Sequence, residues 1–245
     1  MRRPLGVGVV VAVVLAACSG TGSHHDPQSD TWDRGSQPAA DSHPTTSAPA
    51  RLVIPSDVSG VSTAIADVDG DGRLEEVATY RSPDGGHYLS TRTAAGATST
   101  IEVQMQSKGV DPIVATADIG TARDTVFVET AHTKTAFEIV PYAFIDDGWN
   151  VVEAATEGSP RLPIVLSGAS GDVYGVSCRM LDDSPGLTLA SLTQTEGGFL
   201  LTTTDYRLDG TTLQPVGDPI VQGAIIPTRD LSIDDSFSIN CPRSR

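Results

Sequence analysis

The residues of this sequence best suited to chemistry lie in one acidic stretch, Asp67-Val68-Asp69-Gly70-Asp71-Gly72-Arg73-Leu74-Glu75. Carboxylates occupy its positions 1, 3, 5 and 9, and two glycines permit a tight turn between them. Ca²⁺ takes six to eight oxygen ligands, and alternate residues of a tightly wound loop direct their oxygens to one centre. The spacing therefore favours a calcium-binding loop. A metal-dependent active site and a solvated acidic turn are the alternatives, although carboxylates this close repel one another without a cation.

The sequence on either side of this stretch excludes an EF-hand. That motif needs a bidentate Glu at loop position 12, where this chain has Ala78, and it needs a helix on each side. The flanking segments, 62–67 and 76–81, are instead short apolar runs typical of strands. The acidic stretch is therefore expected to connect two strands.

The pattern D-x-D-G-D-G-x-x-D/E, followed by the apolar run Val77-Ala78-Thr79-Tyr80, resembles the FG-GAP or VCBS-type repeat of integrin-like β-propellers. The resemblance implies one Ca²⁺ in the hairpin between the first two strands of a blade. It also implies the ligands, which are side-chain oxygens of Asp67, Asp69, Asp71 and Glu75 and the backbone carbonyl of Arg73.

The strands that must position this loop recur in three sets of four, and no helical period of three turns is present. The sets are 62–67, 76–81, 88–93 and 100–104; 114–118, 125–130, 136–143 and 149–154; and 173–179, 187–193, 198–206 and 213–216. Gly, Pro, Asp and Ser separate the runs. Units of this size and rhythm predict an all-β, small β-propeller-like domain of about three to four four-stranded sheets. Residues 51–56 and 231–240 are candidates for a further sheet, and a β-sandwich is the alternative fold.

The loops of the second and third units depart from the acidic pattern. The second unit keeps Asp118 but has Gly120 and Ala122 where carboxylates should follow, and the third begins with Arg179. One calcium site is therefore expected in the chain.

The amino terminus predicts export and lipid attachment. Arg2 and Arg3 precede an apolar run that ends in Leu15-Ala16-Ala17-Cys18, a pattern that resembles the bacterial lipobox. The resemblance implies a signal peptide over 1–17, a diacylglycerol on Cys18, and a mature protein on the outer face of the cell membrane. Residues 18–50 are rich in Ser, Thr and Pro and predict a disordered tether before the domain at 51–245. An ordinary signal with a free Cys18 is the alternative.

The two remaining cysteines, Cys178 and Cys241, predict a disulfide, because the compartment is oxidising and their number is even. Two buried thiols are the alternative. The formal net charge is −15, and removal of Arg2 and Arg3 with the signal makes it −17. No basic patch is present, which argues against nucleic acid as a partner and restricts membrane contact to the lipid anchor.

Signals for catalysis are weak. Ser167-Gly168-Ala169-Ser170-Gly171 lacks the G-x-S-x-G spacing, and His87 and His132 each stand alone. We therefore expect no catalytic residue and a calcium-stabilised binding module for an unidentified protein or glycan. Tyr88, Tyr142, Trp149 and Tyr206 are candidate contact residues, with core packing as the other interpretation of each. An exported hydrolase acting on glycans or cell-wall material is the alternative.

Overall fold

The computed structural model describes residues 51–106, 112–134, 136–155, 162–167, 173–196, 198–225 and 239–241. All of these belong to the unit Thr45–Arg245 of the chain. The predicted signal peptide 1–17, Cys18 and the tether 18–50 lie outside the described residues. Within the described ranges, no helix is long and apolar enough to cross a membrane.

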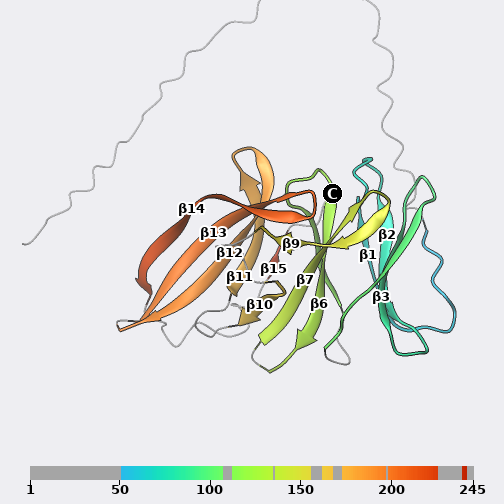
Figure 1. Ribbon diagram of the computed structural model, residues 1–245, viewed down its shortest axis with the longest axis horizontal. Coiled ribbons are helices and arrows are strands. Elements are labelled where there is room, and N and C mark those ends of the chain that lie inside the picture. The colour runs from blue at the N-terminus through green and yellow to red at the C-terminus, as the bar shows by residue number, and fades with distance from the viewer. Residues whose placement is uncertain are drawn as a thin grey trace, which may run out of the picture. The chain divides into compact units, whose positions relative to one another are not determined.

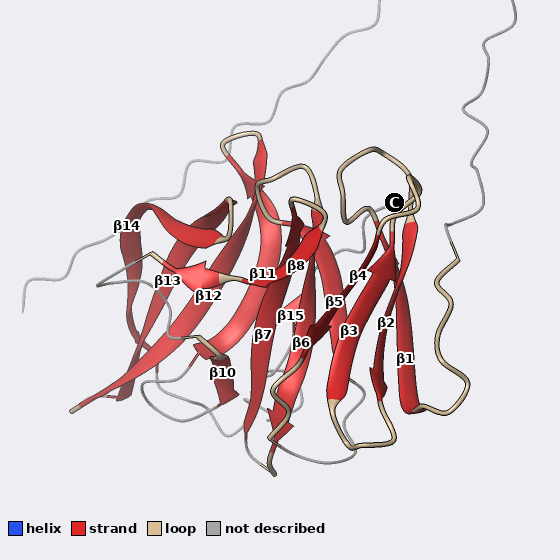
Figure 2. Ribbon diagram, turned by 45° about the vertical axis from the view of Figure 1, so that its right-hand side comes forward, coloured by secondary structure: helices blue, strands red, loops and turns tan. Residues whose placement is uncertain are grey.

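The described chain is all-β, which confirms the predicted fold class (Figure 2). The first eight strands are β1 (Ser59–Ala66), β2 (Glu75–Arg81), β3 (His87–Arg92), β4 (Thr98–Glu102), β5 (Ile113–Asp118), β6 (Asp124–His132), β7 (Ala136–Ile145) and β8 (Gly148–Val151). The others are β9 (Glu153–Ala154), β10 (Ile164–Ser167), β11 (Val173–Leu181), β12 (Ser184–Thr195), β13 (Gly198–Asp209), β14 (Thr212–Ile225) and β15 (Ile239–Asn240).

The strands form three consecutive antiparallel meanders, which are seen side by side in Figure 1. The first, β1-β2-β3-β4, is a sheet of its own. In the second, β5, β6 and β7 pair in order and β8 pairs with β7. The third is β11-β12-β13-β14. These meanders correspond to the three sets of four strands that the sequence predicts.

The second and third meanders differ from the expected separate sheets, because they belong to one eleven-stranded sheet. β10 joins them by pairing antiparallel with β7 and parallel with β11. β9, which follows β8, pairs in parallel with β14. Residues 51–56, a candidate for a further sheet, form no strand. Of 231–240, the described residues are β15, which pairs with β11.

Two apolar clusters hold the meanders together, with the second meander between them. One cluster joins the first meander to the second and includes Val77 and Leu89 on one side and Val126 and Phe144 on the other. The other cluster joins the second and third meanders and includes Phe127. Successive side chains of β6 thus enter opposite clusters. This explains why every residue of β6 from 124 to 130 is buried.

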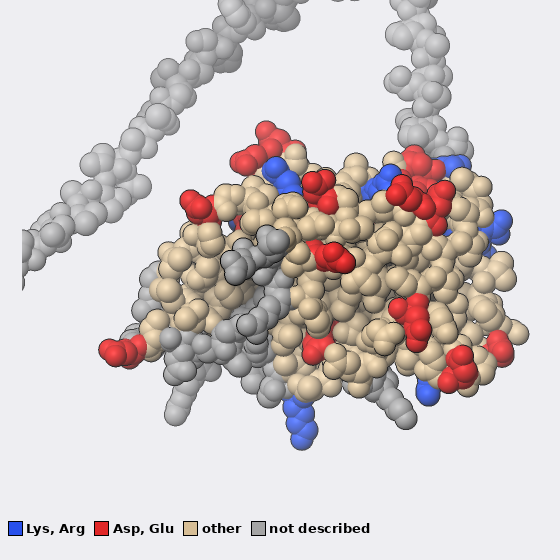
Figure 3. Space-filling view, in the orientation of Figure 1, with Lys and Arg blue, Asp and Glu red and all other residues tan. Residues whose placement is uncertain are grey.

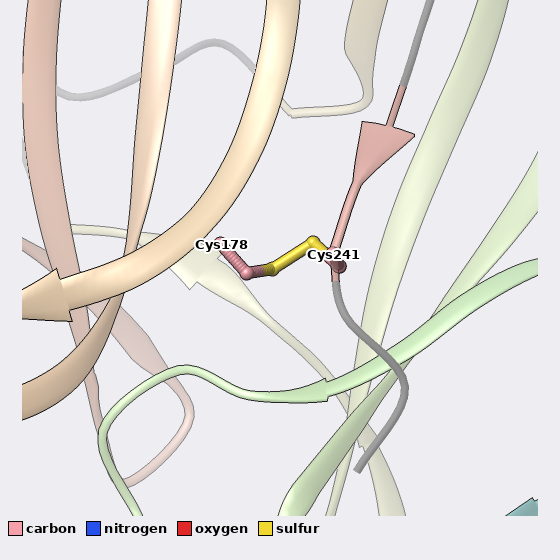
Figure 4. The surroundings of a disulfide bond; sticks show 2 residues. All are labelled: Cys178 and Cys241. Atoms are coloured by element: carbon pink, nitrogen blue, oxygen red, sulfur yellow. A yellow bond between two sulfur atoms is a disulfide. The ribbon is translucent and has the colours of Figure 1, made fainter.

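A disulfide joins Cys178, on β11, to Cys241, which directly follows β15 (Figure 4). The two Cα atoms are 4.5 Å apart and both cysteines pack against the cluster between the second and third meanders. The predicted pairing is therefore present in the structure. It closes a loop of 63 residues, for which the chain-entropy model suggests stabilisation of about 4 kcal/mol.

Candidate metal centre

The acidic loop connects β1 to β2, as the sequence predicts. Ala66, the last residue of β1, lies opposite Glu75, the first residue of β2. The loop between them turns through Gly70 and Gly72, whose φ angles are +76° and +80°. A residue with a β-carbon adopts this left-handed region only with strain, which explains the two glycines.

The loop brings three of the predicted ligands together. One carboxylate oxygen from each of Asp67, Asp69 and Asp71 lies within 4.8 Å of the other two. This is the only such group of three metal-binding side chains among the residues the structure describes. The Asp67 carboxylate also accepts hydrogen bonds from the Gly70 and Gly72 backbone N–H groups, at 2.9 and 3.0 Å. The three carboxylates thus converge on one side of a loop that they themselves help to shape.

Glu75 is the fourth predicted carboxylate, and its environment is unusual. Its side chain is fully buried, at 0% exposure, and it lies outside the 4.8 Å group. Oε2 accepts a hydrogen bond from the Val68 N–H at 3.2 Å, whereas the buried Oε1 has no hydrogen-bond partner among the described residues. Burial, and then the negative charge of Asp69, raises the pKa of Glu75 to about 7. A buried carboxylate oxygen without a partner is energetically costly, and a bound cation would remove that cost.

Arg73 has a role that the sequence did not predict. Its guanidinium donates to Asp71 Oδ2 from Nε at 3.0 Å and from Nη2 at 2.8 Å, and this hydrogen bonding lowers the pKa of Asp71. Burial raises the pKa of Asp69, and the neighbouring charges of Asp71 and Asp67 add to the effect. Among the residues that the structure describes, the ion pair at this loop comes from Arg73, an exposed side chain that pairs with Asp71 at the outer end and forms none with Asp67 or Asp69.

The second meander supports the loop from its other side, a contact that was also not predicted. Asp67 and Asp124, the first residue of β6, exchange two hydrogen bonds: the Asp67 N–H donates to Asp124 Oδ2 at 2.8 Å, and the Asp124 N–H donates to the Asp67 carbonyl at 2.7 Å. Arg123 and Ala122 lie so close to Gly70 that a β-carbon there would be within 3.0 Å of both. The loop is therefore fixed between two meanders rather than held by its own hairpin alone.

The corresponding turn of the second meander is likewise hydrogen-bonded to the next meander, but it lacks the acidic cluster. Its Asp118 carboxylate accepts hydrogen bonds from the Gly120 and Thr121 N–H groups. The Ile119 carbonyl accepts from the Leu208 N–H of the third meander at 2.9 Å, as the Asp67 carbonyl does from Asp124. In the third meander, a two-residue turn of Asp182 and Asp183, both with positive φ, joins β11 to β12. The hydrogen bond from one meander to the first turn of the preceding meander thus occurs twice, whereas the cluster of carboxylates is found, among the described residues, in the first turn alone.

The candidate contact aromatics divide into two groups. Tyr142, Trp149 and Tyr206 are buried in the clusters between meanders, so core packing accounts for them. Tyr88 is half-buried and stacks on Tyr80 outside these clusters.

The fold and the loop together define this chain as an all-β, disulfide-containing protein with an acidic interstrand loop suited to a metal ion. No family model matches the chain, and neither a curated protein nor a solved structure matches it significantly.

Proposed function

We propose that this protein is a membrane-anchored surface lipoprotein whose calcium-stabilised, propeller-like domain serves as a non-catalytic binding module. The observation that carries the calcium part is the convergence of Asp67, Asp69 and Asp71 beside Glu75, whose buried Oε1 has no partner in the part of the chain that the structure describes. Four carboxylates form a hard, all-oxygen donor set, which suits Ca²⁺ better than softer metals. The Arg73 carbonyl would complete the set that the FG-GAP resemblance implies.

The position of the loop supports a structural role for the ion. Asp67 is bonded to Asp124 of the second meander, so an ion held by the loop would also order the contact between the first two meanders. If the Kd were about 0.1 mM and external Ca²⁺ about 1 mM, binding would raise the free energy of unfolding by roughly 1.4 kcal/mol. An ion with this role stabilises the conformation of the domain that presents the binding surface, and it takes no part in catalysis.

A calcium titration of the full chain by calorimetry, together with thermal melts, tests the proposal. Wild-type protein should bind one Ca²⁺ and melt at a higher temperature with it. The variant Asp69→Asn/Asp71→Asn should lose most of both effects, because it removes two of the converging charges.

Asp146→Asn/Asp147→Asn is the matched control, since it removes two acidic charges from the exposed turn between β7 and β8. It should titrate like the wild type. Absence of binding at millimolar Ca²⁺, or equal loss in both variants, would mean that the loop is an acidic turn and that the proposal is wrong.

A further inference from the structure

We propose that the outer face of the first sheet carries a second, calcium-independent site that binds an organic cation: the ammonium or guanidinium group of a lysine or arginine side chain, or a small amine. The inference rests on the proposed function in one respect only, namely that the domain is a binding module. The site is an open pocket of about 250 Å³ beside the hairpin of β2 and β3, lined on one side by Pro55, Asp57 and Val58.

Two tyrosines form the aromatic part of this pocket. Tyr80 on β2 lies directly opposite Tyr88 on β3, and their rings stack with centroids 5.7 Å apart. The neighbouring Leu89 enters the cluster between the first two meanders, so the two tyrosines face the opposite way, outside that core. A β-carbon on Gly86 would lie 2.9 Å from the Tyr88 hydroxyl, which means that the glycine makes room for this ring position.

The segment that lines this side of the pocket is anchored to the same outer face. Leu52 is buried, and its N–H donates to Glu76 Oε2 at 3.2 Å. Glu76 and Tyr80 are four residues apart on β2 and therefore lie on the same side of the strand. This contact holds Pro55 and Asp57 beside the tyrosines, where they line the pocket.

Two carboxylates supply the charge. Asp57 and Asp84 both line the pocket and are both exposed. Ser82 Oγ and the Gly86 N–H donate to Asp84 Oδ1, and these hydrogen bonds lower the pKa of Asp84, so that it stays ionised at neutral pH. Glu102, which is also exposed, lies opposite Tyr88 on β4 and adds a third acidic group nearby.

This combination selects for a positive ligand. Aromatic faces attract cations through the ring quadrupole, and the carboxylates favour the same sign of charge. None of the described residues that line the pocket is Lys or Arg. Arg81 follows Tyr80 on β2 and starts from the other face of the sheet; its guanidinium reaches the Gly85 end of the hairpin turn but does not line the pocket. The net charge of −15 adds a long-range attraction for cations and would repel an anionic ligand.

The test measures binding of small probes to the full chain by two-dimensional NMR. Nα-acetyl-lysine amide and Nα-acetyl-arginine amide are the cationic probes. Nα-acetyl-norleucine amide and Nα-acetyl-citrulline amide are uncharged analogues of similar shape, and n-butylamine, which is protonated at neutral pH, represents a free amine. We expect the cationic probes to shift resonances of the β2–β3 hairpin at millimolar concentration, and the uncharged analogues to bind at least several-fold more weakly.

Three variants locate the interaction. Tyr88→Leu removes the ring but keeps an apolar side chain and should weaken cation binding roughly two- to five-fold, whereas Tyr88→Phe keeps the ring and should bind like the wild type. Asp84→Asn should weaken binding by a similar factor. Asp209→Asn, an exposed carboxylate of the third meander, should leave binding unchanged. Because Asp84 is exposed, its variant remains informative if Tyr88→Leu unfolds the domain.

The outcomes separate this inference from the calcium proposal. Tighter binding of the lysine and arginine amides than of n-butylamine would support a protein partner, and the reverse would support a free amine. Equal binding of charged and uncharged probes, or cation binding unchanged by both Tyr88→Leu and Asp84→Asn, would overturn the inference. The same NMR titration in Asp69→Asn/Asp71→Asn should show cation binding retained, so loss of calcium binding there concerns the other site alone.

Discussion

Among the carboxylates of the acidic loop, Glu75 has the most strongly perturbed environment. It is fully buried and next to three aspartates, and one of its oxygens has no hydrogen-bond partner within the described ranges. Burial disfavours the charged form, and the negative charge of Asp69 disfavours it further, so its pKa rises to about 7. Without a cation, this side chain is about half protonated at pH 7 and becomes mostly protonated as the pH falls below that value. A cation favours the ionised form, since it interacts favourably with the carboxylate only.

The stability of the calcium-free protein should therefore fall as the pH rises from about 4.5 to about 7. The folded-state pKa of Glu75 lies above its ordinary value of 4.5, so the folded protein binds more protons than the unfolded chain within that window. Thermal melts in chelator across this range would measure the slope. Glu75→Gln, which stays neutral, should reduce the slope relative to wild type.

Saturating Ca²⁺ should counteract this loss of stability at higher pH, because it competes with the proton for the Glu75 carboxylate. The difference in melting temperature with and without calcium is expected to grow as the pH rises. A difference that does not change between pH 5 and 8 would contradict the assignment of Glu75 to the metal centre.

At the scale of elements, the loop between β1 and β2 is a joint between two meanders. Val68 is buried in the cluster that the first two meanders share, and Asp67 exchanges two hydrogen bonds with Asp124, one through the Asp67 carbonyl and one through the Asp124 carboxylate. The tight contact at Gly70 belongs to the same joint. The position of the loop between β1 and β2 is therefore determined by its packing against β6 as well as by its own turn.

Gly70 and Gly72 provide a matched pair of substitutions. Both have positive φ, so alanine at either should cost about 1 kcal/mol in backbone strain. A β-carbon at Gly70 also meets Arg123 and the Ala122 carbonyl, whereas one at Gly72 has nothing within 4 Å. Gly70→Ala should therefore lower the free energy of unfolding by roughly 1–3 kcal/mol more than Gly72→Ala does.

Denaturant unfolding in chelator measures this difference, and a calcium titration of both variants measures its effect on the site. Equal destabilisation by the two substitutions would show that the contact between Gly70 and the second meander does not contribute to the free energy of unfolding.

At the scale of the whole molecule, an acidic domain is combined with a predicted lipid anchor and tether. The face in Figure 3 shows more acidic than basic side chains, in keeping with a net charge of −15. Such a charge disfavours adsorption to anionic lipid. Attachment of the mature protein to the membrane is therefore expected to depend on the lipid at Cys18 alone.

Cys18→Ser should abolish attachment of the lipid, because the thiol that accepts it is absent, whereas the apolar run before residue 18 would still hold an unprocessed precursor at the membrane. Fractionation of expressing cells, with mass spectrometry of the mature amino terminus, measures both attachment and the lipid. A wild-type protein whose mature amino terminus carries no lipid on Cys18 would mean that the lipobox interpretation is wrong. Asp146→Asn serves as the matched surface control.

Local patterns in the sequence determined the all-β class, the three sets of four strands and the position of the acidic loop. These features depend on alternation, turn residues and the spacing of carboxylates, all of which act over a few neighbouring residues. The disulfide was predictable for a different reason, since only two cysteines remained after Cys18.

Only the tertiary structure decided how the meanders are joined and what surrounds the loop. β10 is short and pairs with strands from two meanders, so no local pattern marks it. The predicted strand 149–154 is divided between β8 and β9, because its two halves pair with different partners. The contact of Asp67 with Asp124, 57 residues away, and the unpartnered oxygen of Glu75 likewise depend on packing between meanders, which sequence spacing does not encode.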